Sequence, residues 1–157
     1  MIHGKYINQG EDLTDVLKVR QLSLCDAQMN TAKDALDPEA VNILVDLQEE
    51  EGAGGDAFIG CGRILCDVEQ FRFYIDQVGI VPAFRKKGYG EFALHMLVDK
   101  ANLCGAKQVW VKLPDEWDLS DPSHADALRF FKGMHFTFVA EKWMAAEIDD
   151  FHSCCHE

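Results

Sequence analysis

The 157-residue sequence contains no run of 18 apolar residues, no basic start followed by a short apolar segment, and no lipidation motif. It therefore predicts neither a transmembrane helix nor a signal peptide, and we expect a cytoplasmic protein. None of the six cysteines forms a C-x-x-C pair. This favours reduced, mostly buried thiols over a disulfide framework or a redox motif.

Positive charge is scarce, because 15 Lys and Arg stand against 27 Asp and Glu, a formal net charge of −12. Nucleic acids and anionic membranes bind basic surfaces, so neither is expected as a partner. Residues 1–60 hold twelve acidic and four basic residues, a balance of −8, whereas residues 61–140 hold ten of each. The acidic N-terminal part fits a cationic ligand, and it fits an ordinary solvated surface equally well.

The common nucleotide motifs are also missing, since the chain has no G-x-x-x-x-G-K-[ST] and no G-x-G-x-x-G. What is present is a strand-turn-helix pattern over residues 71–103. A β-forming run, whose alternation slips near Gly79, ends at Pro82, and an apolar set with helical spacing follows Gly88. The turn between them holds Arg85, Lys86, Lys87, Gly88, Tyr89 and Gly90.

Such a turn predicts anion binding. A helix N-terminus offers unsatisfied N–H groups and a partial positive charge, and glycine lets the backbone approach an oxyanion closely. Flanking cations add attraction, so the expected ligand is a phosphate or a pyrophosphate.

The segment resembles motif A of the GNAT acyl-CoA N-acyltransferases, [QR]-x-x-G-x-[GA] at a helix start after a strand that ends in V-x-P. Arg85, Gly88 and Gly90 match this signature, and Ile80 and Pro82 match the strand end. A second family signature, N-x-x-A-x-x-F-Y-x-x-x-G-F, is matched by Ala127, Phe130 and Phe136, with His124 in place of Asn, Phe131 in place of Tyr and His135 in place of Gly. A subgroup pattern, R-x-x-V-F-x-x-E-Q, is matched by Arg20 and Gln28, while Ala27 replaces its glutamate.

The resemblance implies one domain over residues 1–157, of α/β (α+β) class. Its mixed, mostly antiparallel sheet should splay at the motif-A strand and be flanked by helices. Short loops predict a meander of strands near 41–47, 58–66 and 71–81 after a first strand at 3–8. Another strand is expected at 108–113, a helix from about residue 124, and final strands at 137–142 and 151–155.

By the same resemblance, acetyl-CoA or another acyl-CoA is the cosubstrate, and no metal is expected. Backbone N–H groups of residues 86–91 would hold the pyrophosphate, and exposed backbone at Val78 and Ile80 would pair with the pantetheine arm. The cofactor-binding residues are then Val78, Ile80, Arg85, Lys86, Lys87, Gly88, Tyr89, Gly90, Glu91, His124 and Phe131. A zinc site built from His152, Cys154, Cys155 and His156 is disfavoured, because adjacent cysteines on a strand point to opposite faces.

Two side chains are catalytic candidates. Asp76 is the acid nearest the acceptor end of the strand and a candidate general base, although it could equally be a solvated carboxylate or a partner of Arg72. Phe131 has no proton to give where the family has Tyr. His124 could contact the cofactor or supply that proton, because imidazole can donate near neutral pH, or it could be plain helix-terminal surface.

We therefore predict an N-acetyltransferase that acts, by direct attack in a ternary complex, on a primary amine of a small molecule or peptide. We expect this acceptor to be cationic. The alternative is a weak or inactive CoA-binding module with a regulatory or interaction role, as Phe131 would allow. Turnover separates the two hypotheses and cofactor binding does not. The oligomeric state stays open, with a homodimer as one alternative.

Overall fold

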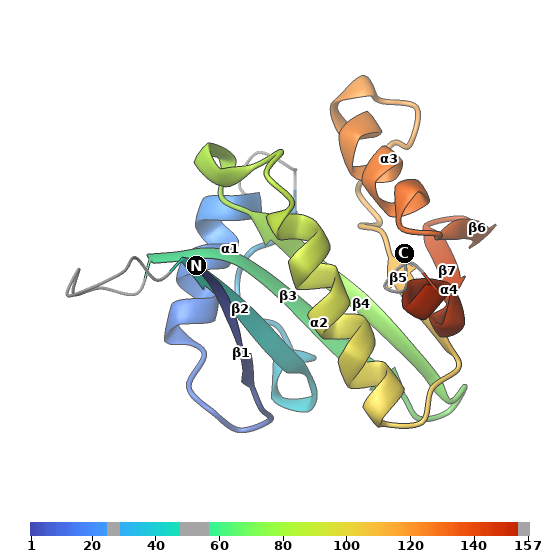
Figure 1. Ribbon diagram of the computed structural model, residues 1–157, viewed down its shortest axis with the longest axis horizontal. Helices are drawn as coiled ribbons and strands as arrows, with labels where there is room; N and C mark the ends of the chain where they lie inside the picture. Colours follow the sequence, from blue (N-terminus) through green and yellow to red (C-terminus); the bar gives the residue numbers. More distant parts are fainter. Residues whose placement is uncertain (25–28, 48–56, 154–157) are drawn as a thin grey trace.

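The computed structural model describes residues 1–24, 29–47 and 57–153. Across these residues it forms a seven-stranded sheet in the order β1-β2-β3-β4-β5-β7-β6 (Figure 1). All neighbouring strands are antiparallel except β4 and β5, which confirms the mixed, mostly antiparallel sheet. The strands are β1 (Ile2–Ile7), β2 (Val41–Leu47), β3 (Ala57–Asp67), β4 (Arg72–Ile80), β5 (Gln108–Lys112), β6 (Thr137–Ala140) and β7 (Trp143–Glu147).

Two helices cover opposite faces of the β1–β4 meander, and α2 crosses the front of the sheet in Figure 1. The side chains of β2 point alternately to the two faces of the sheet, and each face packs against a different helix. Ile43 and Val45 join the apolar cluster of α2 (Tyr89–Leu103), whereas Leu44 joins a second cluster with Val16 of α1 (Thr14–Leu24). Burial on both faces accounts for the three consecutive apolar residues at 43–45 of β2.

The other half of the molecule consists of β5, β7 and β6 with α3 (Ala125–Gly133) and α4 (Ile148–Ser153). Phe136 is fully buried between them, with its ring centroid 6.0 Å from Phe131 and 5.7 Å from Phe151. Short 3-10 turns η1 (Asp37–Glu39), η2 (Pro82–Phe84) and η3 (Pro122–His124) complete the described elements. No helix in the described ranges is long and apolar enough to cross a membrane.

The two halves meet along a short parallel pairing. Only Tyr74 with Trp110 and Ile75 with Val111 are paired between β4 and β5. Beyond Ile75, β4 continues to Ile80 along β3 but leaves β5. The predicted splay at the motif-A strand is therefore present.

The predicted last strand at 151–155 is wrong, because residues 151–153 belong to α4. The strand that completes the sheet is β7, which follows β6 through a tight turn with Lys142 at φ 64°. Its W-M-A-A-E sequence is rich in helix-forming residues, so the strand is stabilised by central burial between β5 and β6 and not by propensity. Cys154, Cys155 and His156 lie outside the described residues, as do Ala27 and Gln28.

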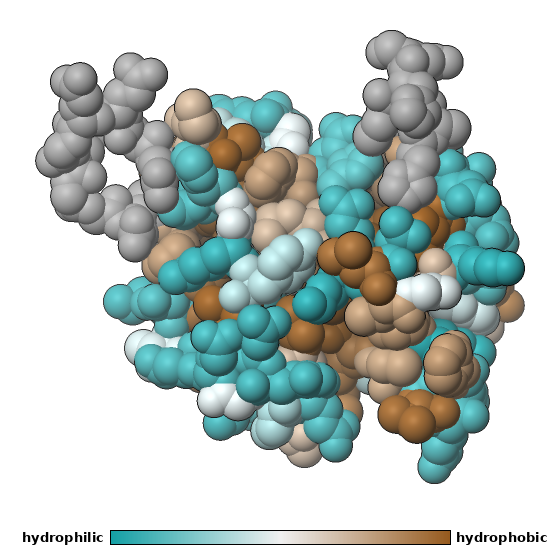
Figure 2. Space-filling view, turned by 60° about the horizontal axis from the view of Figure 1, so that its bottom comes forward, coloured by the Kyte–Doolittle hydropathy of each residue, from teal (hydrophilic) through white to brown (hydrophobic). Residues whose placement is uncertain are grey.

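The expectation of mostly buried thiols is wrong for two of the three described cysteines. Cys61 is buried, whereas Cys66 and Cys104 are exposed at the ends of β3 and α2. That end of the molecule also exposes apolar side chains at Val68, Phe71 and Leu103. It comes forward in Figure 2, where apolar residues lie scattered among charged ones.

Candidate active site

A cavity of about 620 Å³ lies at the gap between β4 and β5. Its walls come from β4, the ends of α1 and β5, the N-terminal turn of α2, and α3 with the loop before it. Of the site residues predicted above, it brings together Asp76, Val78, Ile80, Arg85, Lys86, Gly88, Gly90, Glu91, His124 and Phe131. Lys87 and Tyr89 do not line it, and the Lys87 ammonium lies 5.9 Å from the Phe84 ring centroid instead.

The turn before α2 has the geometry of an anion site. Gly88 is the N-cap residue with φ 86°, a left-handed conformation that glycine adopts without strain. The first helical bond runs from Phe92 N–H to the Gly88 carbonyl, 3.2 Å, so the N–H groups of residues 89–91 precede the helical ladder. A Cβ at Gly90 would lie 3.5 Å from the Phe130 ring, which places this glycine on the cavity wall.

Arg85 fixes this turn to the sheet. Its Nε donates to the carbonyl of Ile80 at 2.8 Å, and its Nη2 donates to the carbonyl of Ser23, also at 2.8 Å. The side chain thus links the end of β4 to the end of α1. Its predicted contact with a pyrophosphate stays a prediction.

The open edge of β4 faces the cavity. Val81 N–H donates to the Ile59 carbonyl on β3 at 2.8 Å. Because N–H directions alternate along a strand, those of Val78 and Ile80 face the other way, into the gap that β5 leaves. This edge can pair with an extended amide chain or donate to an oxyanion.

His124 is a buried polar side chain on the cavity wall. It is 3% exposed, and its ring is stacked on Trp117 with centroids 4.1 Å apart and planes within 12°. Its Nε2 has no hydrogen-bond partner among the described residues. Phe131, seven residues later in the same helical segment, is 8% exposed and packs edge-on against Phe130, with ring centroids 5.3 Å apart.

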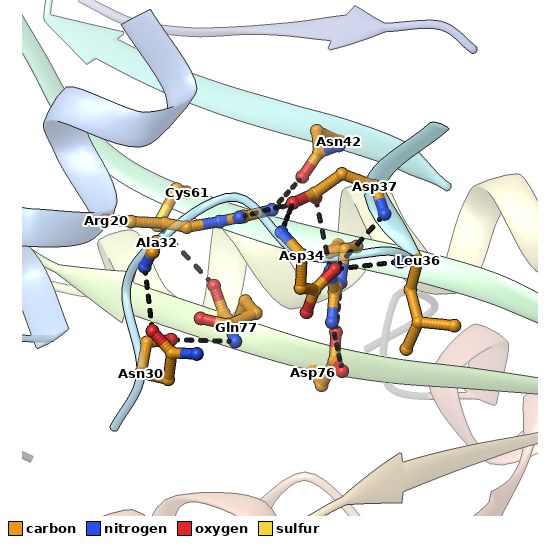
Figure 3. Close-up of polar contacts among 11 residues, drawn as sticks. Arg20, Asn30, Ala32, Asp34, Leu36, Asp37, Asn42, Cys61, Asp76 and Gln77 are labelled. Carbon is orange, nitrogen blue, oxygen red and sulfur yellow. Dashed lines mark hydrogen bonds and ion pairs between the residues drawn. The ribbon is translucent and has the colours of Figure 1, made fainter. Parts of the chain in front are cut away.

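Behind β4 lies a buried network of two arginines (Figure 3). Arg20 donates to both carboxylate oxygens of Asp37, at 3.0 and 2.5 Å, and to Asn42 Oδ1 at 2.8 Å. Burial alone would raise the pKa of Asp37, but hydrogen bonds from Arg20 and from the Asp34 N–H lower it well below its ordinary value. Asp37 is therefore a fixed carboxylate.

Arg63 connects this pair to the cavity. Its Nε and Nη2 donate to the two oxygens of Asp76 at 2.7 and 2.8 Å, and Nη1 donates to Asp34 at 2.7 Å and to Asp37 at 3.1 Å. Burial would lower the pKa of Arg63, but bonds to Asp76 and Asp34 raise it, so its charge is permanent. Arg72, named above as a partner for Asp76, instead lies over Trp110 at 3.7 Å.

Gln77, like Trp117, lines the cavity but was not predicted as a site residue from the sequence. It has φ 54°, at a bulge where the β3–β4 register shifts between Cys61 and Arg63. The break in the alternating apolar pattern near Gly79 was the signal of this bulge in the sequence. Its Nε2 donates to the Asn30 carbonyl at 3.3 Å, and its buried Oε1 has no partner among the described residues.

The family model for acetyltransferases of the GNAT family matches residues 14–136. No curated protein matches the chain by sequence.

Solved structures share the fold. Escherichia coli ElaA superposes with a TM-score of 0.67 at 16% identity, over 94% of this chain and 100% of that one. An acetyltransferase of the GNAT family from Staphylococcus aureus gives 0.65 at 8% identity, over 94% and 99%. N-acetylglutamate synthase from Neisseria gonorrhoeae, complexed with coenzyme A and N-acetyl-glutamate, gives 0.65 at 14% identity over 94% of this chain and 35% of that chain.

Proposed function

The chain belongs to the GNAT acetyltransferase family, and from this premise we propose that it transfers an acetyl group from acetyl-CoA to a primary amine of a small molecule or peptide, by direct attack in a ternary complex. One observation carries the proposal. A single cavity joins the glycine turn at the start of α2, the unpaired N–H edge of β4 and the enclosed imidazole of His124. These are an anion site, a strand edge for an amide chain, and a proton carrier.

The residues present fit a CoA thioester. The N–H groups of Tyr89, Gly90 and Glu91, with the Lys86 side chain nearby, would hold the pyrophosphate. The Val78 and Ile80 N–H groups would pair with pantetheine amides, and whichever lies nearer the acyl carbonyl would stabilise its oxyanion. Acetyl-CoA itself supplies the acyl group, activated as a thioester.

His124 is the proton donor in this proposal. His124 lines the cavity, its buried Nε2 has no partner among the described residues, and stacking on Trp117 fixes the plane of its ring. An imidazolium there can give its proton to the leaving thiolate, the role that Phe131 cannot fill. General acid catalysis of this kind contributes about 100-fold or more to turnover.

Asp76 is held by Arg63 and does not act as the general base considered from the sequence in this proposal. Both of its oxygens accept from Arg63, so it would take up a proton only by giving up one of these bonds. We infer that the acceptor amine loses its proton to water, and that Asp76 and the one-third-exposed Asp34 make this end attractive to a cationic acceptor. Three carboxylates against two guanidinium groups leave one net negative charge there.

The test is thiol release from acetyl-CoA in the presence of a panel of primary amines. The wild-type chain should release CoA only when an amine is present, and His124→Phe should lower kcat about 100-fold with little change in acetyl-CoA affinity, because Phe keeps the stack on Trp117 and removes Nε2. His135→Asn is the matched control, since Asn tolerates its φ of 74° and His135 does not line the cavity.

Acetyl-CoA binding without amine-dependent turnover across the panel would refute the transferase proposal and favour the CoA-binding module. Equal kcat for wild type and His124→Phe would refute the role of His124 alone. In that case the thiolate leaves unprotonated or takes its proton from solvent.

A further inference from the structure

We propose that Cys66 and Cys104 form an oxidisable dithiol site, in which a small disulfide such as oxidised glutathione converts the two thiols into a disulfide cross-link between the end of β3 and the end of α2. Both side chains are exposed, and they lie at the end of the sheet away from the glycine turn. Figure 1 shows the C-terminal end of α2 and the β3–β4 turn at this same end. The site is independent of the proposed acetyl transfer.

A close contact between β3 and α2 sets the relative position of the two thiols. A Cβ at Gly62 of β3 would lie 2.7 Å from Cδ1 of Leu97, so the strand and the helix touch there. Leu97 and Cys104 are almost two full helical turns apart and therefore lie on the same side of α2. Gly62 and Cys66 are separated by an even number of residues, so they point to the same face of the sheet.

The two elements also run in the same direction. Gly60 of β3 pairs with Ile80, and a Cβ at Gly90, in the first turn of α2, would lie 3.7 Å from the Ile80 side chain. Beyond the Leu97 contact, the thiol of α2 lies about 10.5 Å further along the helix, and the thiol of β3 about 13 Å further along the strand. The two thiols are therefore level with each other to within about 3 Å along the sheet.

The two ends differ in how firmly they are held. The Asp67 carboxylate accepts from the N–H groups of Glu69 and Gln70 at 3.1 and 3.4 Å, which fixes the turn after β3. Cys104 is the C-cap residue of α2, and Gly105 after it has φ 90° in an exposed turn. A shift of this last helical turn is the movement that brings the two Cα atoms to the separation of about 4.4–6.8 Å that a disulfide needs.

The two thiols also influence each other. Partial burial raises the pKa of the Cys66 thiol, and so do the negative charges of Asp67 and of ionised Cys104. Because water and salt screen exposed charges, such an influence requires the two sulfur atoms to lie within about 10 Å of each other. A raised pKa also keeps Cys66 protonated near neutral pH, so the reduced dithiol is the resting state.

The reaction is a thiol–disulfide exchange in two steps. The thiolate of one cysteine attacks a sulfur of oxidised glutathione, which forms a mixed disulfide and releases one glutathione thiolate. The second cysteine attacks the mixed disulfide and releases the other glutathione thiolate. The two cysteines lose two electrons and two protons, and the two glutathione thiols receive them. The second step is intramolecular, so it is favoured over attack by another glutathione molecule.

The cross-link would close a loop over residues 66–104. This loop contains β4, the glycine turn and α2, which is the segment assigned above to the cofactor. Closing a loop of this length restricts the unfolded chain, so oxidation should raise the melting temperature by about 5 °C or more.

The experiment treats the purified 157-residue chain with oxidised glutathione and maps its disulfides after digestion with trypsin. Cys66 and Cys104 lie in separate tryptic peptides, 64–72 and 101–107, and neither peptide contains another cysteine. We expect these two peptides to be joined in a product lighter by two hydrogen atoms than their sum, together with the rise in melting temperature. Dithiothreitol should reverse both effects.

Two single variants and one double variant complete the test. Cys66→Ser and Cys104→Ser should each lose the rise in melting temperature but remain as stable as wild type in dithiothreitol, because both side chains are exposed. The matched control combines Asn102→Cys with Cys104→Ser, which moves the thiol to the far side of α2 and should prevent the cross-link. The proposal is overturned if wild type carries glutathione separately on the two cysteines, if it forms covalent dimers instead, or if the matched control is stabilised equally.

Discussion

Arg63→Met should destabilise the fold far more than an ordinary arginine substitution. The Arg63 side chain is 2% exposed and donates four hydrogen bonds to Asp34, Asp37 and Asp76. Met fills a similar volume without charge. Asp37 keeps Arg20, but Asp34 and Asp76 lose their cation.

The magnitude follows from the exposure of those two carboxylates. Breaking a fully buried ion pair costs about 3–5 kcal/mol, because it leaves an uncompensated charge. Asp76 is 15% exposed and Asp34 33% exposed, so water compensates in part and we expect about 3 kcal/mol. Urea denaturation at pH 7 measures this free energy of unfolding.

Arg129→Met is the matched control. Its partner in an ion pair is Asp126, and the two side chains are 74% and 77% exposed, so the substitution should cost no more than a few tenths of a kcal/mol. An Arg63→Met variant as stable as Arg129→Met would refute the view that the network holds the fold together.

The pH dependence identifies the cause. Burial would raise the pKa of Asp37, but Arg20 and the Asp34 N–H lower it, so its contribution to stability is present above the unfolded pKa of about 3.9 and is lost as the pH falls toward the folded value. The charge of Arg63 also lowers the pKa of Asp37, so Arg63→Met moves that pKa back toward its unfolded value and the variant loses less stability on acidification. The difference in stability between wild type and Arg63→Met should therefore narrow as the pH falls below about 4. If the difference in the free energy of unfolding between wild type and Arg63→Met does not change with pH, the variant has lost packing and not charge pairing.

Two further substitutions test the cavity. Gly90→Val should abolish most of the rise in melting temperature caused by acetyl-CoA, because its Cβ would lie 3.5 Å from the Phe130 ring and its methyl groups would enter the cofactor path. Gly133→Val is the control and should keep that rise, since a Cβ there meets nothing within 4 Å. If acetyl-CoA raises the melting temperature of both variants equally, the cofactor binds elsewhere. In a His124→Phe background, Phe131→Tyr should recover part of the lost kcat, since it returns a hydroxyl to the cavity wall. An unchanged kcat would show that this ring does not face the leaving sulfur.

The parts of the fold that were predictable are those with local signals. The expected strands at 41–47, 58–66 and 71–81 match β2, β3 and β4 within one or two residues, because alternation and short loops encode a meander. The start of α2 followed from a glycine-rich turn after Pro82. β7 was missed because its Met and Ala residues form a strand only through tertiary burial.

The buried network could not be predicted, because periodicity tells which face a residue occupies and not which partner it meets. Arg20 and Asp76 were noticed singly, the first through a family pattern and the second through its place on the strand. Their link through Asp37 and Arg63 joins α1, η1, β3 and β4. An arginine inside the apolar run 58–65 was the available signal, because a buried guanidinium needs carboxylate partners.

The buried arginine network and the gap between β4 and β5 are connected through β4. A strand that leaves its neighbour exposes a row of N–H groups, and side-chain bonds to that strand help to fix its position. β4 is held by Arg63, which pairs with Asp76 from β3, and by Arg85, which binds the Ile80 carbonyl and the end of α1. The two anchors fix β4 on either side of the bulge at Gln77, and between them the Val78 N–H faces the gap that β5 leaves.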